Sequence, residues 1–136
     1  MPKSRKTPNE SFVRAVLAQR LVRKICAKCK KEYTPLEKEL LEIGLPKENA
    51  KNIKLYRGAG CSECNSSGYK GRTGLYELLI VDDKIRELVI KRASLSAIRE
   101  EACRAGMNTL RQNGLKKVMD GVTTLEEVLR ETKEYA

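Results

Sequence analysis

Two Cys-x-x-Cys pairs limit what this chain of 136 residues can fold around more than any other feature. The pairs are Cys26–Cys29 and Cys61–Cys64. Two intervening residues let the chain turn so that both sulfurs of a pair face one ion at about 2.3 Å. Each pair can therefore supply two corners of a tetrahedron. The sequence predicts one metal site with four thiolate ligands: Cys26, Cys29, Cys61 and Cys64.

The composition narrows the choice of ion and its role. The chain has no His, which excludes His-ligated metal sites as well as Ser-His-Asp and Cys-His catalysis. Four thiolates favour zinc, with iron in a four-sulfur site as the alternative. Because four ligands leave no open position, we expect one structural zinc that activates no water. The fifth cysteine, Cys103, is expected to be a small core residue on the apolar face of a helix.

Positive charge is concentrated at the N-terminal end of the chain, whose net charge is +10. Residues 1–31 hold ten Lys and Arg against a single acidic residue, Glu10. Such a segment fits phosphate, acidic lipid or an acidic partner. Two other interpretations stay open. The charges are the solvated face of a helix, or they offset the charge of about −2 of a divalent metal with four thiolates.

Hydrophobic periodicity predicts an amphipathic helix over residues 8–25, which a capping box at Thr7–Glu10 would start. Its apolar side repeats every four residues: Val13, Leu17, Leu21 and Ile25. Its polar side presents four basic residues as a candidate interaction surface: Arg14, Arg20, Arg23 and Lys24.

Further start and stop signals divide the rest of the chain. A helix is expected from Thr34-Pro35 to Gly44, and short strands at 53–56 and 75–81. Asp82, Ser94 and Thr124 are expected to cap helices, and another helix is expected over 110–119. The expected fold class is therefore mainly α with a small β element, in which short amphipathic helices surround a tetracysteine zinc knuckle. The expected domains are a flexible basic tail, 1–10, and one zinc-bearing domain, 11–136, with a helical subdomain at 82–136.

The glycine-rich run Gly68–Gly74 invites comparison with a phosphate-binding loop. It lacks the Gly-x-x-x-x-Gly-Lys-Ser/Thr spacing and precedes a strand instead of a helix, so tight turns beside the metal explain it better. No other residues form a catalytic constellation, and we expect no enzyme activity from this chain alone. The longest aliphatic run, Leu78–Val81, is too short for a transmembrane helix.

Several segments together resemble the tetracysteine region of the type II secretion and type IV pilus assembly ATPases. The matching segments are 17–26, 68–79, 106–110, 120–124 and 126–128, and the resemblance extends over about residues 12–132. It implies that Cys26, Cys29, Cys61 and Cys64 hold zinc in a module at the C-terminal end of a motor that is a homo-hexamer. The family's phosphate-binding loop, acidic motif and histidine motif have no counterpart in this sequence, so its ATP binding is not carried over.

The leading function is thus a non-catalytic zinc module that couples a secretion or pilus motor to its core or to an inner-membrane platform protein. Its expected place is the cytoplasm, at most peripheral to the inner membrane. The alternative is a free-standing zinc ribbon that binds nucleic acid through the basic N-terminal segment. Residues 13–31 lack the aromatic side chains on which bases stack. A chaperone-type zinc module is a third interpretation, but the repeated Cys-x-x-Cys-x-Gly-x-Gly units are missing.

Overall fold

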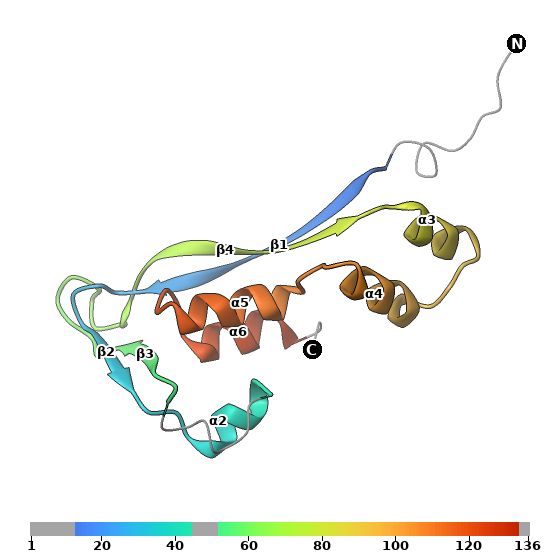
Figure 1. Cartoon of the computed structure of the whole chain (residues 1–136). Helices are drawn as coiled ribbons and strands as arrows, with labels where there is room; N and C mark the ends of the chain where they lie inside the picture. Colours follow the sequence, from blue (N-terminus) through green and yellow to red (C-terminus); the bar gives the residue numbers. More distant parts are fainter. Residues whose placement is uncertain (1–12, 45–51, 134–136) are drawn as a thin grey trace, which may run out of the picture. The chain divides into compact units, whose positions relative to one another are not determined.

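The computed structural model describes residues 13–44 and 52–133, and this part of the chain contains five helices and four strands (Figure 1). The strands form two small antiparallel sheets, one of β1 and β4 and the other of β2 and β3. The expectation of a mainly α fold is wrong, because strands supply a substantial share of the regular structure. In chain order the elements are β1 (Ala15–Ile25), β2 (Lys30–Tyr33), α2 (Glu37–Glu42), β3 (Leu55–Gly58), β4 (Tyr69–Ile80), α3 (Asp83–Ile90), α4 (Leu95–Arg104), α5 (Leu110–Met119) and α6 (Leu125–Glu131).

The chain divides into two compact units. The first takes in Met1–Ala18 and Tyr76–Thr109, and the second takes in Gln19–Leu75 and Leu110–Ala136. The two long strands β1 and β4 therefore each contribute residues to both units. In the first unit α3 packs against α4. In the second unit α5 packs against α6 and β3, and both cysteine pairs belong to this unit.

The strand β1 occupies the segment for which a helix was predicted, and the prediction is wrong over residues 15–25. The first part of the predicted helix, residues 8–12, lies outside the described residues. The physical reason is that a spacing of four residues is close to one helical turn and is also an even number. Residues at i and i+4 therefore share a face of a helix and equally a face of a strand. Pairing with β4 selects the strand.

The other local signals are confirmed more closely. Side-chain oxygens of Asp82, Ser94 and Thr124 accept hydrogen bonds from backbone N–H groups at 2.9, 3.1 and 3.2 Å and so cap α3, α4 and α6. The helix α2 is followed by Gly44 with a φ of +77°. The second predicted strand, 75–81, overlaps β4 over residues 75–80, and β4 begins earlier, at Tyr69.

The core of the second unit is made of aliphatic side chains from its three helices, α2, α5 and α6, and from both sheets. At the contact between α5 and α6, a Cβ on Gly114 would lie 2.6 Å from a methyl carbon of Val128. Glycine therefore allows the two helices to approach closely. The fully buried aliphatic residues of this unit are Val22, Leu40, Leu55, Leu75, Leu110, Val118 and Val128.

The position of Cys103 on α4 differs from the prediction. Its side chain is exposed, whereas the neighbouring Ala102 is buried. One residue along an α-helix corresponds to a rotation of about 100°. If the apolar face is assigned one residue out of place, a residue expected in the core therefore lies at the surface.

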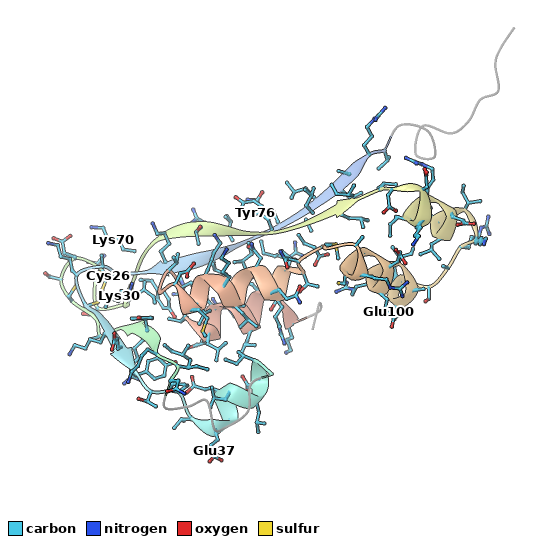
Figure 2. The ribbon with its side chains drawn as sticks, viewed as in Figure 1. Cys26, Lys30, Glu37, Lys70, Tyr76 and Glu100 are labelled. Carbon is cyan, nitrogen blue, oxygen red and sulfur yellow. The ribbon has the colours of Figure 1, made fainter. Side chains whose placement is uncertain are left out.

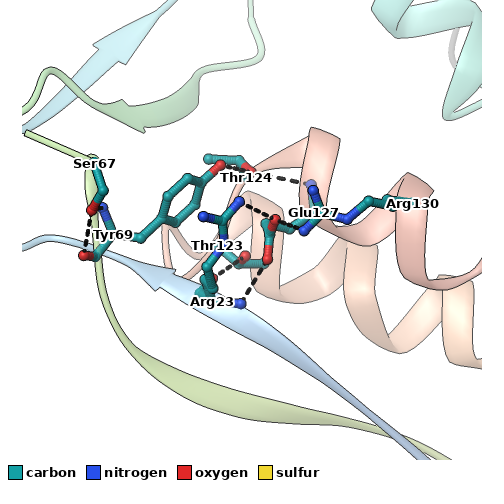
Figure 3. A network of polar contacts seen from close by, with 7 residues as sticks. All are labelled: Arg23, Ser67, Tyr69, Thr123, Thr124, Glu127 and Arg130. Carbon is teal, nitrogen blue, oxygen red and sulfur yellow. Dashed lines mark hydrogen bonds and ion pairs between the residues drawn. The ribbon is translucent and has the colours of Figure 1, made fainter.

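A buried carboxylate ties β1 to α6 in the second unit (Figure 3). Glu127, at 1% exposure, accepts hydrogen bonds from the N–H of Arg23 at 2.8 Å and from its guanidinium at 2.9 Å. Arg130 also bonds this carboxylate. The hydroxyl of Thr123 donates to the carbonyl of Arg23 at 2.6 Å, and the N–H of Ile25 donates to Val122 at 2.9 Å. The end of β1 is thus bound along the turn between α5 and α6.

The Arg23 guanidinium lies 4.1 Å from the centre of the Tyr69 ring, and the Tyr69 hydroxyl forms a hydrogen bond of 2.8 Å with Thr124. Tyr69 belongs to β4, so the network joins three elements. A cation over an aromatic face is attracted by the ring quadrupole. The guanidinium is therefore positioned by the ring on one side and by Glu127 on the other.

Burial alone would raise the pKa of Glu127, but hydrogen bonds from the side chain and N–H of Arg23 and the charge of Arg130 hold it below its ordinary value. A carboxylate with a lowered pKa stabilises the fold above its unfolded pKa, and this stabilisation is lost as pH falls through the folded pKa. We therefore predict that Glu127→Gln lowers the free energy of unfolding by about 2 kcal/mol at pH 7. The deficit should shrink below the ordinary Glu pKa of about 4.3.

Denaturant unfolding between pH 3 and 7 measures this difference. Glu126→Gln is the matched control, because Glu126 is the exposed neighbour of Glu127 on the same helix. A difference between wild type and Glu127→Gln that does not change with pH would contradict the role of the carboxylate charge.

Candidate metal centre

The four paired cysteines converge in the second unit with their Sγ atoms all within 4.8 Å of one another. The separation is 3.8 Å for Cys26–Cys61, 3.8 Å for Cys29–Cys64 and 3.7 Å for Cys61–Cys64. Four sulfurs at about 2.3 Å from a central ion form a tetrahedron with edges of about 3.8 Å. The observed spacing therefore fits a tetrahedral site, and all four cysteines are free thiols, available as ligands.

The sheet of β2 and β3 brings the two pairs together across the long intervening segment. Its register pairs Lys30 with Gly58 at one end and Tyr33 with Leu55 at the other. Cys29 directly precedes β2, and the chain reaches Cys61 three residues after β3 ends. Cys26 follows the last residue of β1. The cysteines therefore sit where three strands meet.

Backbone N–H groups point at two of the sulfurs. The N–H of Gly60 donates to Cys29 at 3.2 Å, and the N–H groups of Cys61 and Gly68 donate to Cys64 at 3.3 and 3.2 Å. Such donors stabilise thiolates and orient them toward a metal. Burial raises the pKa of Cys29 despite its donor. Burial also acts to raise the pKa of Cys64, but its two backbone N–H donors, together with hydrogen bonds from the Cys61 and Cys29 thiols, lower the pKa below its ordinary value.

The site is closed by the protein on most sides. Cys26, Cys29 and Cys64 are buried and Cys61 is partly exposed. Four cysteine ligands complete a tetrahedron, so no position remains for water or substrate. The chemistry that this arrangement can support is therefore structural metal binding.

Positive side chains lie next to the cysteines. Lys70, which is labelled near Cys26 in Figure 2, pairs with Glu63 at 3.0 Å. The hydrogen bond to Glu63 and the charge of Glu63 raise the pKa of Lys70, with smaller contributions from the charges of Cys26 and Cys61. Lys30 lies 4.8 Å from the centre of the Tyr56 ring.

The four basic residues predicted as an interaction surface do not share one environment. Arg14 belongs to the first unit, where its carbonyl accepts from Val81 at 2.9 Å. Arg20 donates to the carbonyl of Gln19 at 3.0 Å. The aliphatic part of Lys24 lies beside Gly71, and Arg23 is bound to Glu127.

The sequence does not reveal the partner of Arg23. Glu127 carries only a capping signal in the sequence, and 104 positions separate it from Arg23. No periodicity connects residues that far apart.

Comparisons with known proteins identify the family. A sequence model described as "Type II/IV secretion system protein" matches residues 5–130. The chain is 48% identical over 119 residues to the type IV pilus assembly ATPase PilB of Thermus thermophilus. It is 47% identical over 124 residues to the type II secretion system ATPase E of Vibrio cholerae. This chain belongs to the type II/IV secretion system protein family.

The two matches cover 88% and 91% of this chain, but only 13% of the PilB protein and 24% of the type II secretion ATPase. The chain thus spans less than a quarter of the length of these ATPases. The two identities are nearly equal, so they do not separate the pilus system from the secretion system. Among the residues that the structure describes, no helix has the length and apolarity to cross a bilayer.

We predict that this secretion-family chain binds one Co²⁺ per molecule in a tetrahedral sulfur site, and that Cys61→Ser abolishes tight binding. The reason is that three thiolates leave one corner of the tetrahedron without its sulfur. Absorption spectroscopy of the reduced protein during Co²⁺ titration measures the effect.

Cys103→Ser is the matched control, because it removes an exposed thiol outside the cluster. It should leave the spectrum unchanged and cost less than about 1 kcal/mol of stability. An unaltered Co²⁺ spectrum in Cys61→Ser would show that the four sulfurs do not act together.

Proposed function

We propose that this chain is a non-catalytic zinc-binding module of a secretion or pilus assembly ATPase, placed at the C-terminal end of the motor. The four sulfurs at tetrahedral spacing carry this proposal. The family match supports it, because the relatives are named as ATPases and are several times longer than this chain. The module's role is to stabilise its part of the motor and to couple it to the motor core or to an inner-membrane platform protein.

Zinc is the ion that the ligand set favours. Among the common metals, soft thiolate ligands select zinc or iron. Zinc does not change its oxidation state, which suits a purely structural site. Cys26, Cys29, Cys61 and Cys64 would hold it. A bound zinc supplies folding free energy, because the unfolded chain has no preformed site.

No step of ATP hydrolysis is assigned to this chain. A phosphate-binding loop cradles triphosphate through successive backbone N–H groups at a helix start. In this chain the glycines at 68, 71 and 74 instead lead into or lie within the strand β4. ATP turnover would therefore belong to other parts of a full-length motor. The proposed location is the cytoplasm, at the inner face of the inner membrane.

The nucleic-acid alternative is not favoured by the site. It depends on the positive charge of residues 1–31. Within the described part of that segment, Arg23 is paired with Glu127 and stacked on Tyr69. The basic residues Arg14, Arg20 and Lys24 stay candidates for contact with a protein partner.

We predict one zinc ion per chain when the protein is purified without added metal. Native mass spectrometry should show a mass increase close to one zinc, and a strong chelator should remove it and lower the thermal midpoint. The midpoint should fall because bound metal stabilises the folded state. A coloured protein would indicate iron at the same position. That result would change the identity of the ion but not the four-thiolate site. A fully folded, metal-free protein would contradict the proposal.

An apolar face in the first unit supports contact with another part of a motor. The N–H of Val81 donates to the carbonyl of Arg14 at 2.9 Å. In an antiparallel pair this register places Leu78 opposite Leu17 on one face. The exposed fractions are 58% for Leu17, 48% for Leu78 and 57% for Ile80. A contiguous exposed apolar patch of this kind marks an interaction site.

The sheet that carries this face has only two strands in the described part of the chain. Two-stranded ribbons are at best marginally stable in water. We therefore propose that the remaining length of a full motor covers the face formed by Leu17, Leu78 and Ile80. Hydrophobic burial would supply the energy of the contact.

We predict that Leu78→Lys in a full-length motor disrupts assembly while the zinc content stays at one per chain. The added charge would have to be buried at the contact, which is costly without a partner. Size-exclusion chromatography and metal analysis measure the two outcomes. Leu95→Lys is the matched control, since Leu95 on α4 is 83% exposed and lies outside this face. Normal assembly of Leu78→Lys would contradict the proposed contact.

A further inference from the structure

Two glycines meet where the chain enters and leaves the second cysteine pair. Gly58 ends β3 and Gly68 directly precedes β4. The loop between them contains Cys61 and Cys64. A Cβ on Gly58 would lie 2.2 Å from the carbonyl oxygen of Gly68, and a Cβ on Gly68 would lie 2.7 Å from that of Gly58. The two stems of the loop are therefore in direct backbone contact, and neither position has room for a side chain.

The stem at Gly68 bonds to both cysteine pairs. Its N–H donates to Cys64 Sγ at 3.2 Å, and its carbonyl accepts from the N–H of Cys26 at 2.9 Å. The stem after Gly58 bonds to the first pair. There the N–H of Ala59 donates to the carbonyl of Cys29 at 3.0 Å, and the N–H of Gly60 donates to Cys29 Sγ at 3.2 Å. The separation of the two stems therefore controls where the two pairs lie relative to each other.

We propose that the backbone contact between Gly58 and Gly68 is a positioning element that sets the separation of the two cysteine pairs and thereby the metal affinity. The proposal rests on the metal-binding role proposed above. A side chain at position 58 would force the stems apart by about 1 Å before ordinary van der Waals contact is restored. Metal–sulfur distances tolerate only about 0.2 Å. The four thiols would remain in the chain, but they could no longer fit one ion equally well.

Close approach, and not backbone conformation, explains the need for glycine at position 58. Glycines with positive φ include Gly44 at +77° and Gly68 at +83°, whereas Gly58 is not among them. An alanine could adopt the backbone conformation of Gly58 and would fail only through its Cβ. The sequence alone does not make this distinction.

The test compares the Zn²⁺ affinity of wild type and Gly58→Ala by competition with a chromophoric chelator, and records the Co²⁺ spectrum of each protein. We expect Gly58→Ala to lower the Zn²⁺ affinity by about 10- to 100-fold, the range that is typical when groups around metal ligands are changed. The Co²⁺ bands should weaken or shift, because the sulfur geometry changes. Gly44→Ala is the matched control for the backbone cost, since Gly44 has a left-handed φ and nothing within 4 Å of its added Cβ. It should bind metal as wild type does.

A second control separates positioning from general loss of stability. Val118→Ala removes buried methyl groups from the core of the same unit and leaves the glycine contact intact. If Gly58→Ala loses much more affinity than Val118→Ala at a similar fall in thermal midpoint, the proposal is supported. Equal losses in these two variants, or wild-type affinity in Gly58→Ala, would overturn the positioning role and leave the metal site standing. If the wild-type chain binds neither ion, the metal-binding function fails, and this inference fails with it.

Discussion

The convergence of two cysteine pairs at the end of the β2–β3 sheet is the constraint on which the second unit depends. This sheet has two strands of four residues each, too few to be stable in water without further support. The four sulfurs at tetrahedral spacing supply that support once an ion is bound, because binding free energy then becomes folding free energy. Cys26 also belongs to the cluster and follows β1, so the same site anchors a strand of the other sheet.

Two further contacts transmit this anchoring to the rest of the unit. The hydrogen bonds of Glu127 attach the end of β1 to α6, three residues before Cys26. The contact of Gly58 with Gly68 closes the loop around the second cysteine pair. One contact depends on a buried charge and the other on the absence of a side chain. The first contact links the strand that leads to Cys26 with the α5–α6 pair, and the second holds together the two ends of the loop that carries Cys61 and Cys64.

The proposed contact with a longer motor would account for the exposed apolar face of this chain. The chain spans 13% of one ATPase relative and 24% of another. Leu17, Leu78 and Ile80 are exposed on a ribbon of two strands in the first unit, which is costly for a protein on its own. In a longer motor the same side chains would contribute binding energy. The second unit thus brings four thiols together at metal-binding spacing, and the first unit carries exposed aliphatic side chains; the proposed coupling role draws on both.

The sequence by itself determined what depends on neighbouring residues. The two Cys-x-x-Cys pairs identified the clustered thiols, because two intervening residues are enough to orient both sulfurs. The caps at Asp82, Ser94 and Thr124 located helix starts, because a cap bonds to the backbone of its own first turn. Even locally there was a limit: the spacing of Val13, Leu17, Leu21 and Ile25 suits a helix and a strand alike, and only pairing with β4 selected the strand.

Apart from the clustering of the two cysteine pairs, the relations between distant segments came only from the tertiary structure. It made Glu127 the partner of Arg23 and left Cys103 at the surface. It also placed Gly58 against the backbone of Gly68, where a Cβ would have no room. Such contacts depend on how whole elements pack, and a single sequence contains no periodic signal that records them. The spacing therefore identified which thiols cluster, whereas the hydrogen bonds and sheet pairing that bring them together came only from the folded chain.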